Sequence, residues 1–204
     1  MISVQANQLS KTYNRRTVFS NLSFAHSEGV LGISGANGSG KSTLLKCMAG
    51  LLRPKSGEIL WKHGAEVLSK DQIKPLIGYS APYINLYDEL TAFENLEFLL
   101  KVSGRTSNEE EINAVLGYVQ MDGFKEQLFK ELSTGQRQRI KLASALITKP
   151  EILFLDEPGS NLDEKGHELV SKIVADQKEK GTLVILASND TIEIGLCDNV
   201  VSLG

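Results

Sequence analysis

The chain has 204 residues, of which 41% are hydrophobic, enough for one substantial domain or one domain with an inserted lobe. Its 22 basic and 25 acidic residues give a net charge of −3, which argues against a dedicated nucleic-acid binder, so we expect no nucleic acid among its partners. Its only cysteines, Cys47 and Cys197, are far apart, which argues against a disulfide scaffold or a zinc site.

No apolar run is long enough to cross a bilayer, and the first residues lack the basic and apolar regions of a signal peptide. We therefore expect a chain that is soluble by itself in a reducing, cytoplasmic compartment. A role at a membrane would then have to come through a partner.

The first part of the chain is typical of antiparallel strands. Apolar and polar residues alternate in short runs from 2 to 33, and turn residues such as Asn14 and Asn21 separate these runs. An apolar strand at 30–34 leads into a glycine-rich turn. Helical spacing follows over 42–52, and Pro54 and Gly57 end that helix before a further strand at 58–61.

Between 91 and 127 the apolar spacing predicts two helices, separated by the polar segment 105–108. Thr91 and Glu94 fit a capping box at the start of the first helix. From residue 140 the α/β pattern returns, with continuous apolar runs at 152–155 and 183–187 that are typical of parallel strands buried on both faces. The helical block is therefore an insertion within α/β sequence.

The glycine-rich turn carries the strongest chemical signal. It matches G-x-x-x-x-G-K-[ST] at Gly35, Gly40, Lys41 and Ser42, between a predicted strand and a predicted helix. Backbone N–H groups of such a loop and the dipole of the following helix bind phosphates. We expect Lys41 to neutralise the β- and γ-phosphates and Ser42 to hold Mg²⁺. The same loop adds four further nucleotide-binding residues, Asn37, Gly38, Ser39 and Thr43.

Asp156 and Glu157 end the apolar run at 152–155. Carboxylates are not buried at the end of an apolar strand unless other groups compensate their charge. The carboxyl ends of parallel strands are where α/β proteins bind ligands. We expect Asp156 to orient Mg²⁺ through its water shell and Glu157 to polarise the attacking water. A solvated strand end is the plainer alternative.

Two further features have both a structural and a functional interpretation. Ser133 precedes a predicted helix and can cap it, and the exposed N–H groups there would also bind an anion. Tyr13 is either a half-buried strand aromatic or a ring that stacks on a base.

Taken together, these segments resemble the nucleotide-binding domain of ATP-binding cassette (ABC) transporters over nearly the whole chain. The resemblance rests on the phosphate loop, the signature segment 132–136 (LSTGQ), the Asp156-Glu157 pair and the D-loop at 160–163 (SNLD). It implies a single α/β domain, 1–204, with the fold of a P-loop NTPase. A RecA-like core and an antiparallel β lobe would occupy 1–80 and 150–204, and an inserted α-helical lobe would occupy 81–149.

The resemblance also implies ATP and Mg²⁺ as cofactors and a head-to-tail dimer of cassettes, either homodimer or heterodimer. ATP on the phosphate loop of one cassette would contact Ser133, Gly135 and Gln136 of the other, and Tyr13 falls where the family stacks an aromatic on adenine. Integral-membrane subunits would dock near the helical lobe, at the inner face of the cell membrane. The segments 16–20, 57–61 and 90–96 are similar to the ATPase subunit of the haem exporter used in cytochrome c maturation.

The chain differs from the family pattern at two catalytic positions. Pro82 lies where the family usually has a glutamine, and Tyr83, Asn85 or Gln72 could supply the missing polar group. Asn189 lies where the family usually has a histidine, and it can donate a hydrogen bond to a γ-phosphate oxygen but cannot carry charge. Losing one preorganised group commonly lowers a rate by about a hundred- to a thousandfold.

Three functions fit these residues. The first is a transport ATPase, because Lys41, Ser42, Asp156 and Glu157 are all present. The second is an ATP-operated clamp with little hydrolysis, suggested by Pro82 and Asn189; in a variant of it, a second cassette supplies the missing groups. The third, a cassette acting in translation or DNA repair, fits less well, because such proteins usually fuse two cassettes or carry long insertions.

Overall fold

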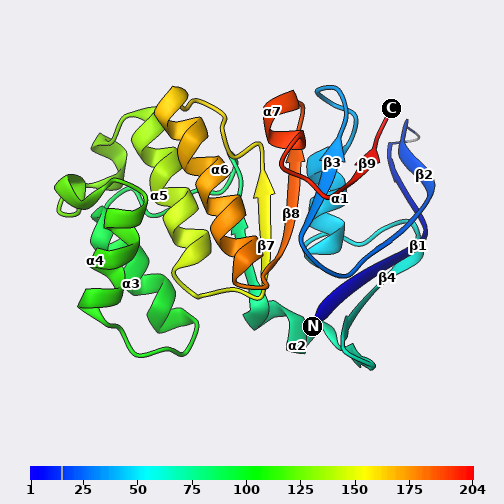
Figure 1. Ribbon diagram of the computed structural model, residues 1–204, viewed down its shortest axis with the longest axis horizontal. Helices are drawn as coiled ribbons and strands as arrows, with labels where there is room; N and C mark the ends of the chain where they lie inside the picture. The colour runs from blue at the N-terminus through cyan, green and yellow to red at the C-terminus, as the bar shows by residue number, and fades with distance from the viewer. Residues whose placement is uncertain (15) are drawn as a thin grey trace.

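The computed structural model describes residues 1–14 and 16–204. A parallel sheet lies at the centre of the molecule, an antiparallel sheet lies on one side of it and helices lie on the other (Figure 1). The parallel sheet consists, in spatial order, of β6 (Ile77–Ser80), β7 (Ile152–Asp156), β8 (Leu183–Ser188), β3 (Val30–Ser34) and β9 (Asn199–Ser202).

The antiparallel sheet consists, in spatial order, of β2 (Arg16–His26), β1 (Ile2–Tyr13), β4 (Ser56–His63) and β5 (Glu66–Leu68). The antiparallel pairing predicted for the first strands is confirmed for β1 and β2. Asn14 and Asn21 adopt positive φ angles of 43° and 52°, a conformation that asparagine tolerates better than most residues.

The main helices are α1 (Lys41–Met48), α3 (Ala92–Val102), α4 (Glu109–Tyr118), α5 (Thr134–Leu146) and α6 (Glu164–Glu179). Two shorter helices, α2 (Lys70–Ile73) and α7 (Thr191–Ile194), follow β5 and β8. The predicted capping box of Thr91 and Glu94 is confirmed at the start of α3. In contrast, the helix predicted over 42–52 ends at Met48, because Gly50 adopts a φ of +73° just beyond it.

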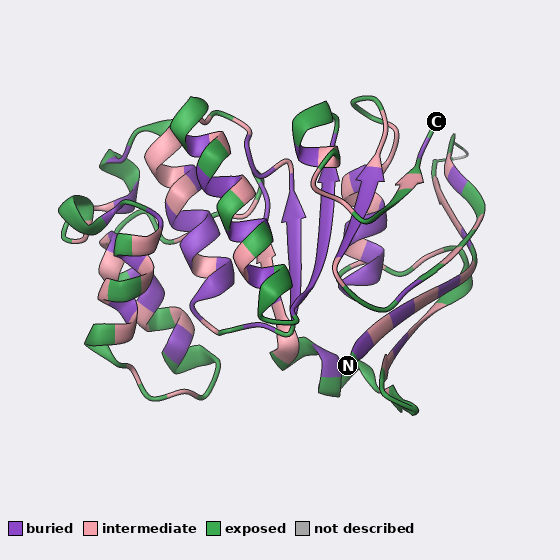
Figure 2. Cartoon of the chain, viewed as in Figure 1, coloured by how far each residue is buried: buried purple, intermediate pink, exposed green. Residues whose placement is uncertain are grey.

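The parallel sheet is covered on both faces, as the continuous apolar runs predicted. Leu153 and Leu155 belong to one core cluster, shared with α3, α5 and α6. Ile152 and Phe154 point to the opposite face, into a cluster shared with α1 and β1. Figure 2 shows the central strands buried and the outer surfaces of the helices exposed.

None of the helices in the described part of the chain combines the length and the hydropathy that crossing a membrane requires. The antiparallel pairing and the buried parallel sheet together give the mixed α/β architecture that the sequence predicted.

Candidate functional site

The carboxyl ends of three parallel strands place the predicted site residues at one edge of the sheet. The phosphate loop, residues 35–40, follows β3; the acid pair ends β7; and Asn189 follows β8. A cleft of about 1030 Å³ opens over this edge. Its walls include nine of the predicted residues, Tyr13, Asn37, Gly38, Gly40, Lys41, Ser42, Thr43, Glu157 and Asn189.

The phosphate loop needs glycine at Gly40. Its φ is +108°, and a Cβ atom there would collide with the side chain of Val18. Helix α1 begins at the next residue, and none of the described side chains caps its N-terminus. The first amides of α1 are therefore available to an anion in the cleft.

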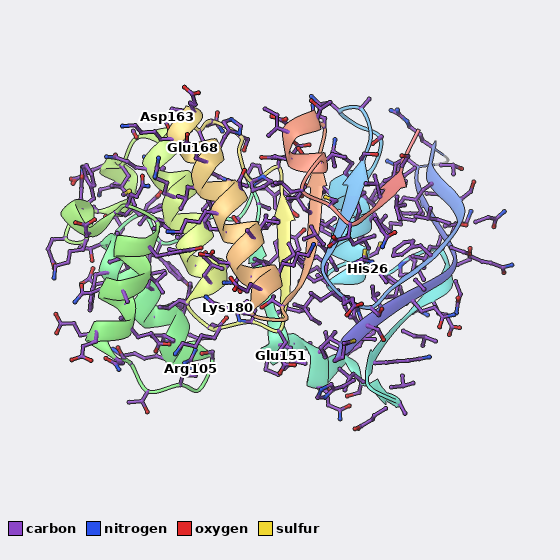
Figure 3. All side chains as sticks on the ribbon, viewed as in Figure 1. His26, Arg105, Glu151, Asp163, Glu168 and Lys180 are labelled. Carbon is purple, nitrogen blue, oxygen red and sulfur yellow. The ribbon has the colours of Figure 1, made fainter. Side chains whose placement is uncertain are left out.

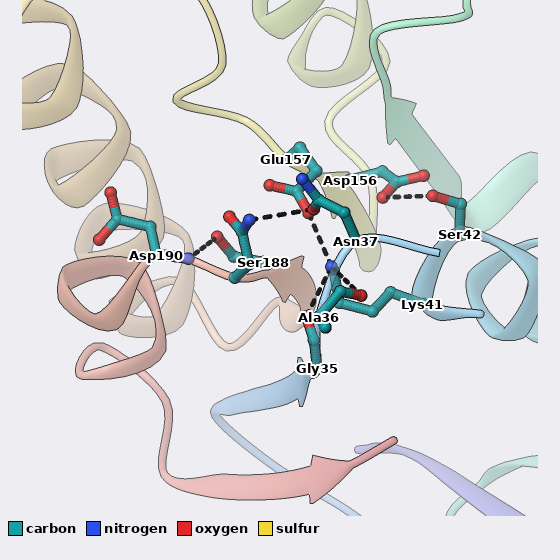
Figure 4. Close-up of polar contacts among 10 residues, drawn as sticks. Gly35, Ala36, Asn37, Lys41, Ser42, Asp156, Glu157, Ser188 and Asp190 are labelled. Atoms are coloured by element: carbon teal, nitrogen blue, oxygen red, sulfur yellow. Dashed lines mark hydrogen bonds and ion pairs between the residues drawn. The ribbon is translucent and has the colours of Figure 1, made fainter. Parts of the chain in front are cut away.

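Lys41 is the most enclosed charged group of the loop, with 5% of its surface exposed. Its Nζ donates hydrogen bonds to the carbonyl oxygens of Gly35, at 2.8 Å, and Ala36, at 3.4 Å. The same atom forms an ion pair of 3.0 Å with Oε1 of Glu157 (Figure 4). A phosphate entering the cleft would therefore compete with Glu157 for the Lys41 ammonium.

Ser42 and Asp156 meet behind the loop, where the Ser42 hydroxyl donates a 3.0 Å hydrogen bond to Oδ1 of Asp156 (Figure 4). Asp156 is fully buried, and its other oxygen, Oδ2, makes no hydrogen bond within the described residues. Burial raises the pKa of Asp156, and its hydrogen bond from Ser42 opposes that rise. Hydroxyl and carboxylate oxygens are the ligands that Mg²⁺ prefers, so this donor set fits the ion that the sequence predicted.

Glu157 has a strained backbone. Its φ is +48°, in a region that non-glycine residues rarely occupy, and its amide donates a 2.8 Å hydrogen bond to the carbonyl of Ala187 on β8. Such strain costs about 1–3 kcal/mol and persists where the surroundings enforce it, commonly at active sites. The turn directs the Glu157 carboxylate into the cleft, where it contacts Lys41.

Asn189 lies directly beside the phosphate loop. Its Nδ2 donates a 3.0 Å hydrogen bond to Oδ1 of Asn37. The two residues next to it form a local turn, in which the Asp190 amide donates to the Ser188 hydroxyl at 3.0 Å (Figure 4). The structure therefore brings Asn189 to the position from which it could donate to a phosphate.

The loop after β6 contains Pro82, which lines the cleft. The Pro82 carbonyl accepts a 2.5 Å hydrogen bond from Nζ of Lys141 on α5. Of the three polar candidates nearby, Gln72 is committed to a capping box with Ser69 at α2, and Asn85 lines a separate groove. Tyr83 remains as the candidate for the polar group of this loop.

The signature residues lie outside this cleft. Ser133 is exposed at the start of α5, where its hydroxyl accepts a hydrogen bond from the Gln136 amide and the Gln136 side chain accepts one from the Ser133 amide. Ser133, Gly135 and Gln136 therefore do not meet Lys41 within one chain. Asp163 of the D-loop caps α6 and lies at the same end of the molecule as Glu168 (Figure 3).

Tyr13, the last residue of β1, is 47% exposed and lines the cleft, so both interpretations of this residue stay open. The ammonium of Lys11 lies 5.0 Å from the centre of its ring. An exposed ring at the mouth of a phosphate site can stack on a base.

Sequence reasoning missed Glu193, which lines the cleft although only 4% of its surface is exposed. Its Oε1 accepts a 2.8 Å hydrogen bond from the amide of Gly159, and a Cβ at Gly159 would collide with Glu193 and His167. Burial raises the pKa of Glu193. Helix α7 is too short to show a buried face by periodicity, so no local signal pointed to this residue.

The comparisons with known proteins agree with this geometry. Residues 19–160 match the family model described as ABC transporter. The chain is 33% identical to an uncharacterized ABC transporter ATP-binding protein, YybJ of Bacillus subtilis, covering 96% of this chain and 89% of that protein. It is 34% identical to the cytochrome c biogenesis ATP-binding export protein CcmA of Shewanella frigidimarina, covering 95% and 89%.

Among solved structures, the chain resembles a dimeric structure of the ATP-binding cassette MJ0796 in a post-hydrolysis state, bound to ADP and Pi. The TM-score is 0.87 at 26% identity, and the match covers 98% of this chain and 94% of that one. With the family match over residues 19–160 and relatives above 30% identity, the chain belongs to the ABC transporter family, as one of its ATP-hydrolysing, ATP-binding cassettes.

Proposed function

We propose that this cassette binds magnesium–ATP in the cleft and drives membrane subunits by ATP-dependent closure of a head-to-tail dimer. The observation that carries the proposal is the meeting of Lys41, Ser42, Asp156 and Glu157 at one edge of the parallel sheet. Lys41 and the amides of α1 would hold the phosphates. Ser42 and Asp156 would hold Mg²⁺, which would neutralise phosphate charge.

The ion pair between Lys41 and Glu157 suggests how nucleotide would prepare the site. With Lys41 paired to Glu157 at 3.0 Å, the lysine compensates the charge of the carboxylate and limits its contact with water. A γ-phosphate would take over the Lys41 ammonium and free Glu157 to act as a base toward the attacking water. The Asn189 amide, now bonded to Asn37, would donate to the same phosphate.

Dimerisation is proposed because Ser133 and Thr134 of the signature segment are exposed in the single chain, and Gly135 and Gln136 are partly exposed. Ser133 caps α5 with its N–H groups at an exposed end of the helical lobe, for which we propose residues 81–149. A second copy, or a different cassette, could present its own phosphate site to this end. The relative MJ0796 has been solved as a dimer with ADP and Pi.

Two serine-to-arginine substitutions test this arrangement. In Glu157→Gln, which should retain bound ATP, we expect magnesium–ATP to produce dimers in analytical ultracentrifugation. Adding Ser133→Arg should abolish them. Ser69→Arg is the matched control, because Ser69 also caps a helix through a capping box but lies on α2. Dimers that survive Ser133→Arg, or that are lost equally in Ser69→Arg, would refute the head-to-tail arrangement.

For the membrane partner, we propose the groove beside the loop that follows β6. This groove has a volume of about 420 Å³, and its apolar wall includes Ile84, Leu86, Tyr87, Phe98, Leu99 and Val102. Tyr87 and Val102 are 56% and 69% exposed, an unusual state for large apolar side chains that face only water. Docking there would place this cassette at the cytoplasmic face of a membrane, through its partner.

The transported compound is assigned by similarity only. Haem export for cytochrome c maturation is proposed from segments 16–20, 57–61 and 90–96 and from the relative CcmA at 34% identity. A molybdenum import protein, ModC of Saccharophagus degradans, is 35% identical, although this chain covers 50% of it. Co-purification of the cassette with cytochrome-assembly membrane proteins would support haem export, and co-purification with an unrelated permease would refute it.

The second candidate function is an ATP-operated clamp with little hydrolysis, favoured by Pro82 and Asn189 in the cleft wall. The two functions differ in how long the closed dimer lasts. If the protein is a transport ATPase, the magnesium–ATP dimer of the wild type should dissociate much faster than that of Glu157→Gln, because hydrolysis removes the γ-phosphate. A clamp should stay closed as long in the wild type as in Glu157→Gln.

A further inference from the structure

Tyr83 is held in place by contacts from two elements of the core, β6 and α1. Its hydroxyl forms a 2.6 Å hydrogen bond with the hydroxyl of Tyr79 on β6. The ammonium of Lys46, on α1, lies 3.7 Å from the centre of its ring. The Tyr79 ring is in turn stacked on Phe154 of β7, with ring centres 5.5 Å apart. Tyr83 is therefore fixed beside β7 although 42% of it is exposed.

These contacts place Tyr83 near the end of β7 that carries Asp156. Tyr79 pairs with Phe154 in the parallel register, so the loop after β6 passes the end of β7, where Asp156 lies two residues beyond Phe154. Lys46, which covers the Tyr83 ring, lies one helical turn after Ser42 on α1, so the two residues share a face of that helix, and Ser42 donates to Asp156. Oδ1 of Asp156 already accepts from Ser42, while Oδ2 makes no hydrogen bond within the described residues.

The hydroxyl has a proton to offer. In the bond between the two tyrosines either oxygen can be the donor. When Tyr79 donates, the proton of Tyr83 is free for the Asp156 carboxylate.

The residue before Tyr83 is hydrogen-bonded to helix α5. The Pro82 carbonyl accepts a 2.5 Å hydrogen bond from Lys141, a residue of α5 that is only 9% exposed. Pro82 and Tyr83 therefore connect the helix that begins at the signature segment with the carboxylate that would hold Mg²⁺. Proline itself has no polar side chain to contribute.

We propose that Tyr83 is the positioning residue for the metal site, in place of the glutamine that the family usually has at Pro82. Its hydroxyl orients the Asp156 carboxylate for Mg²⁺, and Lys141 fixes the loop that carries it. The inference rests on the proposed function, because it concerns the ion bound with ATP. Hydrogen-bond partners of metal ligands typically change metal affinity or activity by about 10- to 100-fold when they are removed.

The test compares Tyr83→Phe with Tyr79→Phe by titrating Mg²⁺ against the binding of a fluorescent ATP analogue, with a parallel titration in EDTA. Both variants lose the tyrosine–tyrosine hydrogen bond and keep the aromatic rings, but only Tyr83→Phe removes the hydroxyl beside Asp156. We expect Tyr83→Phe to raise the Mg²⁺ concentration at half-maximal binding about tenfold. Binding in EDTA should be unchanged, and Tyr79→Phe should stay within about twofold of the wild type.

A rescue sharpens the test. In Pro82→Gln/Tyr83→Phe, the returned polar side chain should restore the Mg²⁺ midpoint toward the wild-type value. The inference is overturned if Tyr83→Phe titrates like the wild type, if Tyr79→Phe shifts the midpoint equally, or if the double variant is no better than Tyr83→Phe. A wild-type chain that does not bind the analogue at all would instead refute the proposed function.

Discussion

The two sides of the cleft differ in how far they keep the residues expected of a cassette. The phosphate loop and the end of β7 carry a full set, with Lys41 bound to Glu157 and Ser42 bound to Asp156. The segments after β6 and β8 carry Pro82 and Asn189 instead. Both sides occupy the same sheet edge, so they differ in residues and not in fold.

The largest effect is expected from Glu157→Gln, which removes the base from the intact side. Turnover should fall by about a thousandfold, while affinity for magnesium–ATP should be retained, because Lys41 loses only a competitor for phosphate. Phosphate release and nucleotide titration measure the two quantities. Glu168→Gln, an exposed acid on α6, is the matched control and should turn over like the wild type. Unchanged turnover in Glu157→Gln would place the base elsewhere.

Next in size is Lys41→Ala, which tests whether the intact side alone holds the nucleotide. Affinity for magnesium–ATP should fall by about a hundredfold, because a charge-assisted contact to phosphate is lost in an enclosed site. Isothermal titration calorimetry would measure it. Lys172→Ala, on α6 and remote from the cleft, should bind as the wild type does. Equal affinity in Lys41→Ala and the wild type would contradict this account of phosphate binding.

A smaller effect is expected from Asn189→His, which gives the altered side the family's residue. Turnover should rise by about tenfold, because a histidine can place positive charge near the γ-phosphate that Asn189 cannot. Steady-state phosphate release at saturating magnesium–ATP is the measurement. If turnover does not rise, Asn189 is not the group that limits the rate, and the contrast between the two sides must be traced to Pro82.

The smallest effect concerns stability, through the buried Glu193. Burial raises its pKa, with Asp190 acting in the same direction and His167 against it, so the folded chain holds this proton to higher pH than the unfolded chain does. The contribution of Glu193 to the free energy of unfolding is therefore fully present below about pH 4.3 and is lost as pH rises through the raised pKa. Glu193→Gln, which keeps an acceptor for Gly159, should be about 1 kcal/mol more stable than the wild type at pH 7.5.

Urea unfolding without nucleotide, at pH 5 and pH 7.5, would measure this difference. The gain from Glu193→Gln should shrink at the lower pH, where the wild-type carboxyl is closer to its neutral form. Glu168→Gln, which is exposed, should follow the wild type at both values. A gain that is the same at both pH values would show that Glu193 does not titrate in this range.

The sequence predicted the features that depend on neighbouring residues along the chain. The phosphate loop, the capping box at Thr91, the helix cap at Ser133 and the buried strands β7 and β8 all follow from local patterns. What it did not predict depends on contacts between distant segments. Glu193 meets Gly159 from 34 residues away, and the choice of Tyr83 over Gln72 depends on where α2 and β7 lie in space.

The contact between the sheet and α5 also limits how the signature end can move. Any side chain at Gly78 would collide with the carbonyl of Ala145, so the last turn of α5 rests directly on β6. The first residue of the helix, Thr134, is then about 17 Å from that contact, at 1.5 Å per residue. A tilt of about 10° at Gly78 would carry Thr134 through about 3 Å, roughly the length of one hydrogen bond. Small rotations of this one helix are thus enough to make or break a hydrogen bond at its signature end.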